Sequence, residues 1–299
     1  MPNLHAALST RYPHSHAVLN HVLDGMTPFG AASVREAYGK MDAPFFEDLE
    51  GGIARVIAIS GADLAHCLAD LDAFNALTPE IENDAWYEQP RAFTSMHLDA
   101  LLLGFARRRL EATCRQVAAF ARPATRVLEI GCGSGRLSEL LVGARPDLEL
   151  TLMDRSAAAI DFVRRLHGAT AAGSRVSCQR GELADIPAPD ATFDGVVAAE
   201  VFEHAPDPGK SAAEILRVLR PGGWLAISVP IDLDIAMHPV VFRDAQDILG
   251  FFGARALELC ASEIVRPVAN VDAIVAVFPD FQGCLNAVFR KRHGVRTGV

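Results

Sequence analysis

The stretch VLEIGCGSGRLS, residues 127–138, places three glycines within five positions directly after a short apolar run. The apolar run predicts a buried strand, and the segment after the last glycine predicts a helix. Glycine loses more backbone entropy on folding than any other residue, so such a cluster indicates that something approaches the main chain closely here. In open α/β sheets, ligands bind beyond the strand ends, where helix N-termini present free N–H groups. The stretch therefore predicts a ligand-binding turn.

From residue 124 onward, expected strands alternate with expected helices, which indicates parallel βαβ units. Two further strands are expected near the end of the sequence, and the RPGG segment at 220–223 is expected to be a turn. The pattern predicts an α/β fold with a doubly wound, mostly parallel seven-stranded sheet. The expected strands are 126–130, 148–154, 175–181, 193–200, 223–230, 254–265 and 283–292, and the expected helices are 135–144, 156–168 and 209–221.

The first third of the chain has a different texture, with apolar residues at helical spacing over 62–77 and shorter helical patterns over 16–23 and 33–39. A long helix is expected to start near Ser95 and to end before Pro123. We therefore divide the chain into a helical extension, residues 1–95, and a sheet domain, residues 96–299. The extension is expected to act as a lid over the sheet or as a dimerisation element, and the sequence leaves both alternatives open.

Composition and charge narrow the class of protein. Half of the 299 residues are hydrophobic and 22% are charged, which suits a chain with a real core. The six scattered cysteines form no CxxC pair, the start shows no secretory signal pattern, and no apolar run reaches membrane-spanning length. We therefore expect a cytoplasmic protein with reduced thiols that does not enter a membrane.

The negative charge is concentrated at one end of the chain. Residues 1–100 hold 5 Lys and Arg against 14 Asp and Glu, so the whole net charge of −9 lies there. An acidic surface repels phosphate backbones, and we therefore expect no nucleic-acid substrate. We therefore expect a small-molecule substrate. We also expect that one use of the acidic extension is to form a homodimer.

Asp154 ends the second expected strand, at the position where an acid can accept hydrogen bonds from ribose hydroxyls. The glycine turn alone would also suit an NAD enzyme. Taken with FDGVVAAEVFEH at 193–204 and RVLRPGGWLAISVP at 217–230, however, residues 124–292 resemble class I S-adenosylmethionine-dependent methyltransferases with a Rossmann-like sheet. The resemblance is to the small-molecule group and implies S-adenosylmethionine as the cofactor.

The resemblance assigns cofactor contacts to residues at the ends of the first four sheet strands. It implies that Asp154 binds the ribose and that Arg155 lies beside the adenine. Glu182 and Leu183 stand where the family has an Asp-containing stretch, and Glu182 departs from that pattern. Glu200 would face the sulfonium group and the acceptor. The residues implied around the methionine part of the cofactor are Glu129, Gly131, Cys132, Gly133 and Gly135.

The EVFEH segment places Glu200, Glu203 and His204 at positions i, i+3 and i+4, which share one face if the segment is helical. Two carboxylates and an imidazole suit Mg²⁺, Mn²⁺ or Fe²⁺. The pattern is similar to the metal-binding segment of ubiquinone-pathway O-methyltransferases, and His238 lies at the same sheet edge. Without a metal, His204 or His238 is the candidate general base, with Glu200 beside it.

The acceptor is expected to contact the segment AWYEQPRAFTSMH, residues 85–97, and the segment 231–253. Methylation of a small molecule at oxygen is the leading hypothesis. The alternatives are N- or S-methylation of an amino-acid-like substrate, whose carboxylate Arg91 would bind, and a methyltransferase-like binding protein without catalysis. The substrate candidates in the first segment are Trp86, Tyr87, Arg91 and His97.

Overall fold

The computed structural model describes residues 85–267 and 281–292, apart from positions 103, 124, 169–174 and 236, together with scattered residues of 52–70 and 274–280. The helices expected over 16–23 and 33–39 lie outside the described residues, as does most of the one expected over 62–77. The division into an extension and a sheet domain therefore stays a prediction.

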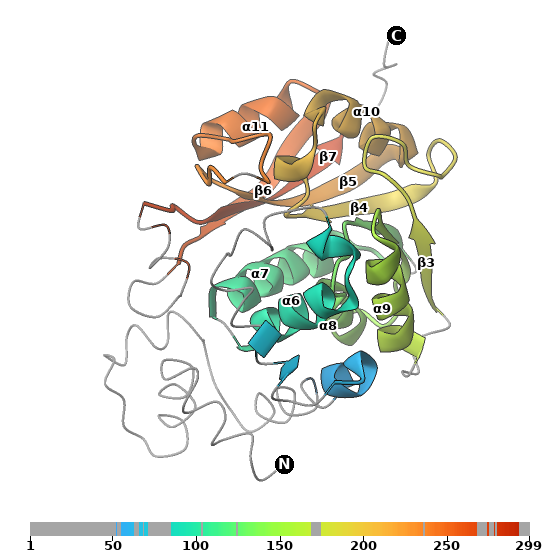
Figure 1. Cartoon of the computed structure of the whole chain (residues 1–299). Coiled ribbons are helices and arrows are strands. Elements are labelled where there is room, and N and C mark those ends of the chain that lie inside the picture. Colours follow the sequence, from blue (N-terminus) through green and yellow to red (C-terminus); the bar gives the residue numbers. More distant parts are fainter. Residues whose placement is uncertain are drawn as a thin grey trace, which may run out of the picture.

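A seven-stranded sheet forms the centre of the molecule, in the order β3-β2-β1-β4-β5-β7-β6 (Figure 1). The first five strands pair in parallel, and β7 runs antiparallel to both β5 and β6. The expected α/β fold with a mostly parallel sheet is confirmed. The strands are β1 Arg126–Ile130, β2 Glu149–Asp154, β3 Val176–Arg180, β4 Phe193–Ala199, β5 Leu219–Pro230, β6 Leu257–Val265 and β7 Cys284–Lys291.

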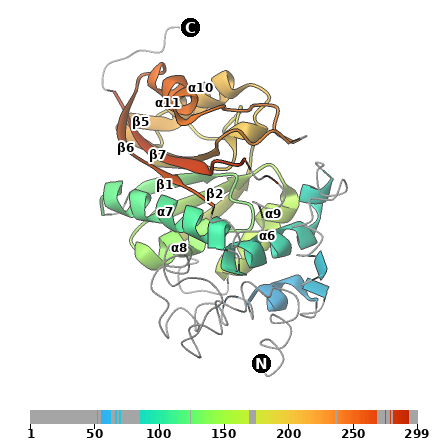
Figure 2. The ribbon, with the colours of Figure 1, turned by 90° about the vertical axis from the view of Figure 1, so that its left-hand side faces the viewer.

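Helices cover both faces of the sheet, as Figures 1 and 2 show. Helices α10 and α11 lie on one face, and α7, α8 and α9 lie on the other, with α6 beside α7 and α9. The helices are α6 Pro90–Leu102, α7 Gly104–Phe120, α8 Arg136–Ala144, α9 Ala157–Gly168, α10 Pro208–Val218 and α11 Ala245–Gly253, with the short 3-10 helices η1 Trp86–Glu88 and η3 Phe202–His204.

The alternation of side chains along the strands divides the core into two layers. Leu128 and Ile130 of β1 pack into the core beneath α10 and α11, whereas Val127 packs into the core beneath α7, α8 and α9. Glu129 lies on the same side of β1 as Val127, so its carboxylate faces the layer of α7, α8 and α9. The sheet edge at the carboxyl end of β1 is therefore apolar on one side and carries an acid on the other.

The long helix expected from Ser95 to before Pro123 corresponds to α6 and α7, which the structure describes on either side of position 103. The first of them begins earlier than expected, at Pro90, because a proline ring suits the first helical position, where no N–H bond is needed. Helix α6 also runs through the boundary expected after residue 95, so any separate extension would end before it.

Two further elements differ from the sequence expectations. The RPGG segment belongs to the start of the long strand β5, where the pairing with β4 is irregular, rather than to a turn after a helix. Helix α11 was not predicted, although Asp244 caps it by accepting a hydrogen bond from the Asp247 N–H. Within the described part of the chain, no helix is long and apolar enough to cross a membrane.

Candidate cofactor and acceptor site

The glycine turn after β1 depends on backbone conformations that side chains disfavour. Gly131, Gly133 and Gly135 have φ values of 66°, 46° and 72°, all in the left-handed region. A Cβ atom on Gly131 would lie 2.5 Å from the side chain of Val201. The turn is tied to β2, because the Cys132 N–H donates to the Met153 carbonyl at 3.1 Å. Burial raises the pKa of the Cys132 thiol well above its usual range, so no thiolate is presented there.

Asp154 ends β2 and joins two turns at the carboxyl edge of the sheet. One carboxylate oxygen accepts from the Gly133 N–H at 2.9 Å, and the other accepts from the Ser156 N–H at 2.9 Å. Burial raises the pKa of Asp154 above its ordinary value, while both backbone hydrogen bonds oppose that shift. A carboxylate has about four lone-pair sites, so Asp154 keeps acceptor capacity for two ribose hydroxyls.

A cavity of about 140 Å³ lies between the glycine turn and helices α6 and α7. Glu129 lines it, is only 3% exposed, and has one carboxylate oxygen without a hydrogen-bond partner. Burial, with a smaller contribution from the charge of Asp154, raises the pKa of Glu129 to about 8. Such an oxygen is costly to bury and suits a ligand cation. The cavity is also lined by Gly131, Cys132, Gly133, Glu200, Met96 and Arg109.

The residues predicted near the adenine lie beyond this cavity, at the ends of β2 and β3. Arg155 is exposed, and its carbonyl accepts from Arg180 at 2.7 Å. Glu182 is exposed and forms an isolated backbone bridge with Asp185, while Leu183 packs against the core beneath α10. All three follow the carboxyl ends of the neighbouring strands β2 and β3. They therefore lie along the same edge of the sheet as the glycine turn. Their cofactor contacts stay a prediction.

Glu200 does not share a helical face with Glu203 and His204, and that expectation is wrong. Glu200 follows β4 with a φ of 56°, and the rest of the EVFEH segment forms only the short 3-10 helix η3. The left-handed conformation turns its carboxylate towards α7 and β5. There it forms an ion pair with Arg109 at 3.1 Å and accepts from the Ser228 hydroxyl at 3.0 Å.

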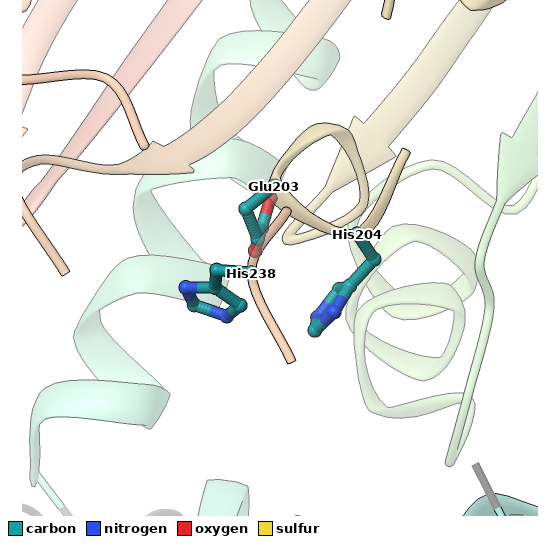
Figure 3. A group of neighbouring side chains, drawn as sticks. All are labelled: Glu203, His204 and His238. Carbon is teal, nitrogen blue, oxygen red and sulfur yellow. The ribbon is translucent and has the colours of Figure 1, made fainter. Parts of the chain in front are cut away.

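Glu203, His204 and His238 converge at the same edge, as Figure 3 shows. One potential ligand atom from each lies within 4.8 Å of the others. The two imidazoles donate from Nδ1 to main-chain carbonyls, His204 to Met237 at 3.0 Å and His238 to Leu233 at 2.9 Å. A carbonyl only accepts, so Nε2 of each neutral ring keeps its lone pair.

The electrostatics of this cluster follow from burial. Burial lowers the pKa of both His204 and His238 below the ordinary histidine value, which favours neutral imidazoles. Glu203 is 1% exposed and has one oxygen without a hydrogen-bond partner. Burial and the nearby charge of Glu200 raise the pKa of Glu203 well above its usual range.

None of the four predicted substrate residues lines the cavity beside the glycine turn. Trp86 is buried and packs with Ala92, and Tyr87 packs against this pair. Arg91 lies over the Trp86 ring at 4.6 Å and bonds Gln89 at 2.7 Å. Arg91 also forms an ion pair with Asp70 at 3.7 Å, so its guanidinium contacts protein groups on both sides.

His97 is fully buried beneath the glycine turn. Its Nδ1 lies 2.8 Å from the Ser134 carbonyl, and its Nε2 lies 3.1 Å from a carboxylate oxygen of Glu139. His97 therefore connects α6 to the glycine turn and to α8, and it does not line the cavity.

The sequence analysis missed Arg109, the basic residue that pairs with Glu200. Arg109 is the last residue of the run RRR at 107–109, and Arg107 and Arg108 do not line the cavity. Helical spacing with Ala106 and Thr113, both buried, would have placed Arg109 on the inner face of α7. Nothing local indicated that Glu200 would be its partner.

A family model matches the part of the chain that contains most of these residues. Residues 128–227 match the family model described as a methyltransferase domain. These residues begin in β1 and end in β5, so they include the glycine turn, Asp154, Glu200 and the Glu203–His204 pair. In its fold and in this matched stretch, the chain is similar to class I S-adenosylmethionine-dependent methyltransferases.

Two curated relatives agree with this class. The O-methyltransferase resE of Aspergillus sclerotiorum is 34% identical over 112 residues, which cover 38% of this chain and 41% of the relative. The ubiquinone biosynthesis O-methyltransferase of Xylella fastidiosa (strain 9a5c) is 39% identical over 106 residues, or 34% of this chain and 41% of the relative. The chain thus spans about two fifths of the length of the relatives it matches.

Solved structures agree on the fold. The crystal structure of the [4+2]-cyclase SpnF aligns with a TM-score of 0.56 at 17% sequence identity, over 63% of this chain and 82% of that chain. At this identity the likeness concerns the fold alone. The predicted Rossmann-like methyltransferase architecture is confirmed.

Proposed function

We propose that this protein transfers the methyl group of S-adenosylmethionine to an oxygen atom of a small-molecule acceptor. The observation that carries the proposal is the cavity beside the glycine turn, where Glu129 keeps a buried oxygen without a hydrogen-bond partner. The O-methyltransferase names of the relatives supply the choice of oxygen. Both relatives are matched over less than half their length, so the acceptor is inferred only as a class.

The residues around the cavity fit the cofactor. The unpartnered oxygen of Glu129 suits the ammonium group of the methionine end, and an ammonium group would satisfy a carboxylate that is otherwise costly to bury. Asp154, already held by two backbone N–H groups, suits the ribose hydroxyls further along the sheet edge. The left-handed glycines leave the main chain free of side chains between these two acids.

Methyl transfer is an in-line displacement at an activated sulfonium carbon, so the protein mainly has to align the reactants and exclude water. An oxygen acceptor gains reactivity when it loses its proton. Where no ion is bound, His204 or His238 is suited to accept that proton, because each donates Nδ1–H to a carbonyl and leaves Nε2 as the basic atom. Glu200, fixed by Arg109 and Ser228, lines the cavity beside them.

We further propose that Glu203, His204 and His238 hold a divalent ion of the Mg²⁺, Mn²⁺ or Fe²⁺ type. The buried, unpartnered oxygen of Glu203 and the two Nε2 lone pairs form a mixed oxygen and nitrogen ligand set. When bound, such an ion would lower the pKa of an acceptor hydroxyl. The fourth residue predicted for this role, Glu200, is bonded to Arg109 in this structure.

The remaining expectations concern where and with what the protein acts. We propose a cytoplasmic enzyme that acts on a small molecule and not on nucleic acid, in line with the net charge of −9. Homodimer formation stays a prediction that size-exclusion chromatography with light scattering would test. Arg91 is engaged with Gln89 and Asp70, so no observed contact favours the amino-acid-like alternative.

Titration with S-adenosylhomocysteine tests the proposed function, followed by transfer of radiolabelled methyl groups to a panel of phenolic and catecholic acceptors. Saturable binding with labelled O-methyl products is the expected result. Binding without any transfer would favour a non-catalytic binding protein, and absence of binding would contradict the cofactor assignment. Repeating the assay with a chelator and then with added Mn²⁺ tests the ion separately. If neither addition changes the rate of transfer, the ion site is contradicted.

Substitution of Asp154 by alanine is expected to weaken binding of S-adenosylhomocysteine by roughly tenfold to a hundredfold, the usual effect of losing hydrogen bonds to a charged group. The variant loses the proposed ribose contacts and also the bond that holds Gly133. Isothermal titration calorimetry measures the affinity. Asp161→Ala is the matched control, because that carboxylate on α9 is 70% exposed. Unchanged affinity in Asp154→Ala would contradict the ribose role.

A further inference from the structure

His97 is a buried side chain of α6 that contacts the glycine turn but does not line the cavity. Its Nδ1 lies 2.8 Å from the Ser134 carbonyl oxygen, which belongs to the turn. A carbonyl oxygen only accepts hydrogen bonds, so Nδ1 carries a proton and is the donor. The other ring nitrogen, Nε2, lies 3.1 Å from a carboxylate oxygen of Glu139 but is not aligned for a hydrogen bond. The bond to Ser134 is therefore the directed contact of the ring.

The turn needs such a contact because its glycines are conformationally permissive. Ser134 stands between Gly133 and Gly135, which both have a positive φ, and glycine adopts several backbone conformations at similar cost. The bond from the Gly133 N–H to the end of β2 holds one side of the turn. On the other side, the Gly135 carbonyl accepts from the Ser138 hydroxyl at 2.7 Å. His97 supplies the contact at the position between them.

The surroundings of His97 hold the imidazole in this orientation. The ring is fully buried, and the Phe162 ring of α9 lies 6.1 Å from it, measured between centroids. Although burial raises the pKa of Glu139, its contacts with His97 and Arg136 lower it to about 2, so the carboxylate is ionised. This carboxylate attracts the Nε2 side of the ring and thereby keeps Nδ1 directed at Ser134.

Helix α6 also forms part of the wall of the cavity. Met96, Asp99 and Ala100 line the cavity from this helix. Met96 is so close to the turn that a Cβ atom on Gly133 would lie 3.2 Å from its methyl group. The helix precedes residues 128–227, the stretch that matches the family model. The contact with the turn is therefore made by a part of the chain that the family match does not include.

We propose that His97 is a positioning residue that keeps the glycine turn in the conformation that binds the cofactor. The inference rests on the proposed function and adds to it a residue outside both the cavity and the matched stretch. Without the bond from Nδ1, the peptide groups beside Ser134 adopt other conformations, and only a fraction of the molecules is competent to bind. The apparent affinity falls in proportion to that fraction.

Three substitutions of His97 separate this role from a general contribution to stability. His97→Asn keeps a donor at the δ position, facing the Ser134 carbonyl, whereas His97→Gln moves the donor to the ε position, beside Glu139. His97→Ala removes both. All three lose the packing of the ring and are expected to unfold at a lower temperature than the wild type.

Isothermal titration calorimetry with S-adenosylhomocysteine is expected to show a different order. Binding is expected to be about tenfold weaker in His97→Ala and His97→Gln, in which a buried acceptor loses its donor. In His97→Asn it is expected to stay within about twofold of the wild type. Ser211→Ala is the matched control, because Ser211 on α10 is 1% exposed and donates to the Asp207 carbonyl at 2.9 Å, on the opposite face of the sheet. The control is expected to lose stability and to keep the affinity of the wild type.

Equal losses of affinity in His97→Asn and His97→Gln, or wild-type affinity in His97→Ala, would overturn the positioning role and leave the proposed function intact. Failure of the wild type to bind S-adenosylhomocysteine would overturn the proposed function together with this inference. A proton–nitrogen NMR correlation spectrum of the imidazole rings tests the bond in the wild type, whether or not the variants fold. Nδ1 of His97 is expected to appear as a protonated nitrogen, and an Nδ1 without a proton would overturn the inference.

Discussion

A Glu129→Gln variant is expected to bind S-adenosylhomocysteine roughly ten to a hundred times more weakly than the wild type, and to be more stable without ligand at alkaline pH. The loss of affinity follows from removing the carboxylate that we propose to face the cofactor ammonium, since hydrogen bonds to charged groups contribute about 1.5–3 kcal/mol. The gain in stability follows from removing a carboxylate that is 3% exposed and has an unpartnered oxygen.

The pH dependence of stability has a defined sign. Folding raises the pKa of Glu129 from 4.5 to about 8, so between these values the native state holds a proton that the unfolded chain has released. The free energy of unfolding therefore falls as pH rises through this window, by roughly 1.4 kcal/mol for each pH unit at most. Thermal unfolding from pH 5.5 to 8.5 is expected to show this decline in the wild type and to lack it in Glu129→Gln.

Cofactor affinity is expected to change in the opposite direction with pH. Because the ammonium group favours ionised Glu129, binding of S-adenosylhomocysteine to the wild type is expected to strengthen from pH 6 to pH 8. Glu149→Gln, which alters an acid with a 60% exposed side chain in the neighbouring strand, is the control for both measurements. A pH-independent affinity in the wild type, or an equal stability slope in both variants, would contradict the role assigned to Glu129.

His204→Ala is expected to lower turnover by about a hundredfold or more, the range in which a positioned general base contributes, while cofactor affinity stays within about twofold. The imidazole of His204 lies beside that of His238, with 4.8 Å between the ring centroids. It does not line the cavity beside the glycine turn. Steady-state rates and calorimetry on the same preparation separate the two effects. Full turnover in this variant would remove His204 from the reaction.

The pH profile of the wild type provides an independent check on the histidines. Burial lowers the pKa of both His204 and His238, so both rings remain neutral at pH values where an exposed histidine is partly protonated. Turnover is therefore expected to hold constant from pH 8 down to about 6.5, the ordinary histidine pKa, and to decline below it. A decline that begins above pH 7 would contradict a buried neutral base.

Much of the fold could be predicted because its signals are local. The strand–turn–helix at 127–138 is encoded by neighbouring residues, and so are the alternating strands and helices up to β5. The expectations that were wrong met competing local signals. The long helix begins at Pro90, earlier than Ser95, and the left-handed Glu200 interrupts the expected helical face of the EVFEH segment.

The candidate site was predictable only in part for the same reason. Glu129 lies next to the last residue of β1 and Asp154 is the last residue of β2, so both could be assigned to one sheet edge. The substrate candidates around Trp86 were chosen for their residue types, and the structure places them in packing contacts away from the cavity.

By itself, the sequence determined the glycine turn, the parallel sheet and the acids at its edge, because hydrophobic periodicity and glycine conformation act over a few residues. Only the tertiary structure decided that Arg109 meets Glu200 and that Asn286 anchors α7. These partners come from distant segments, and they become neighbours when the sheet aligns the ends of its strands and buries α7 against them. Burial then sets their charge states, which no local pattern encodes.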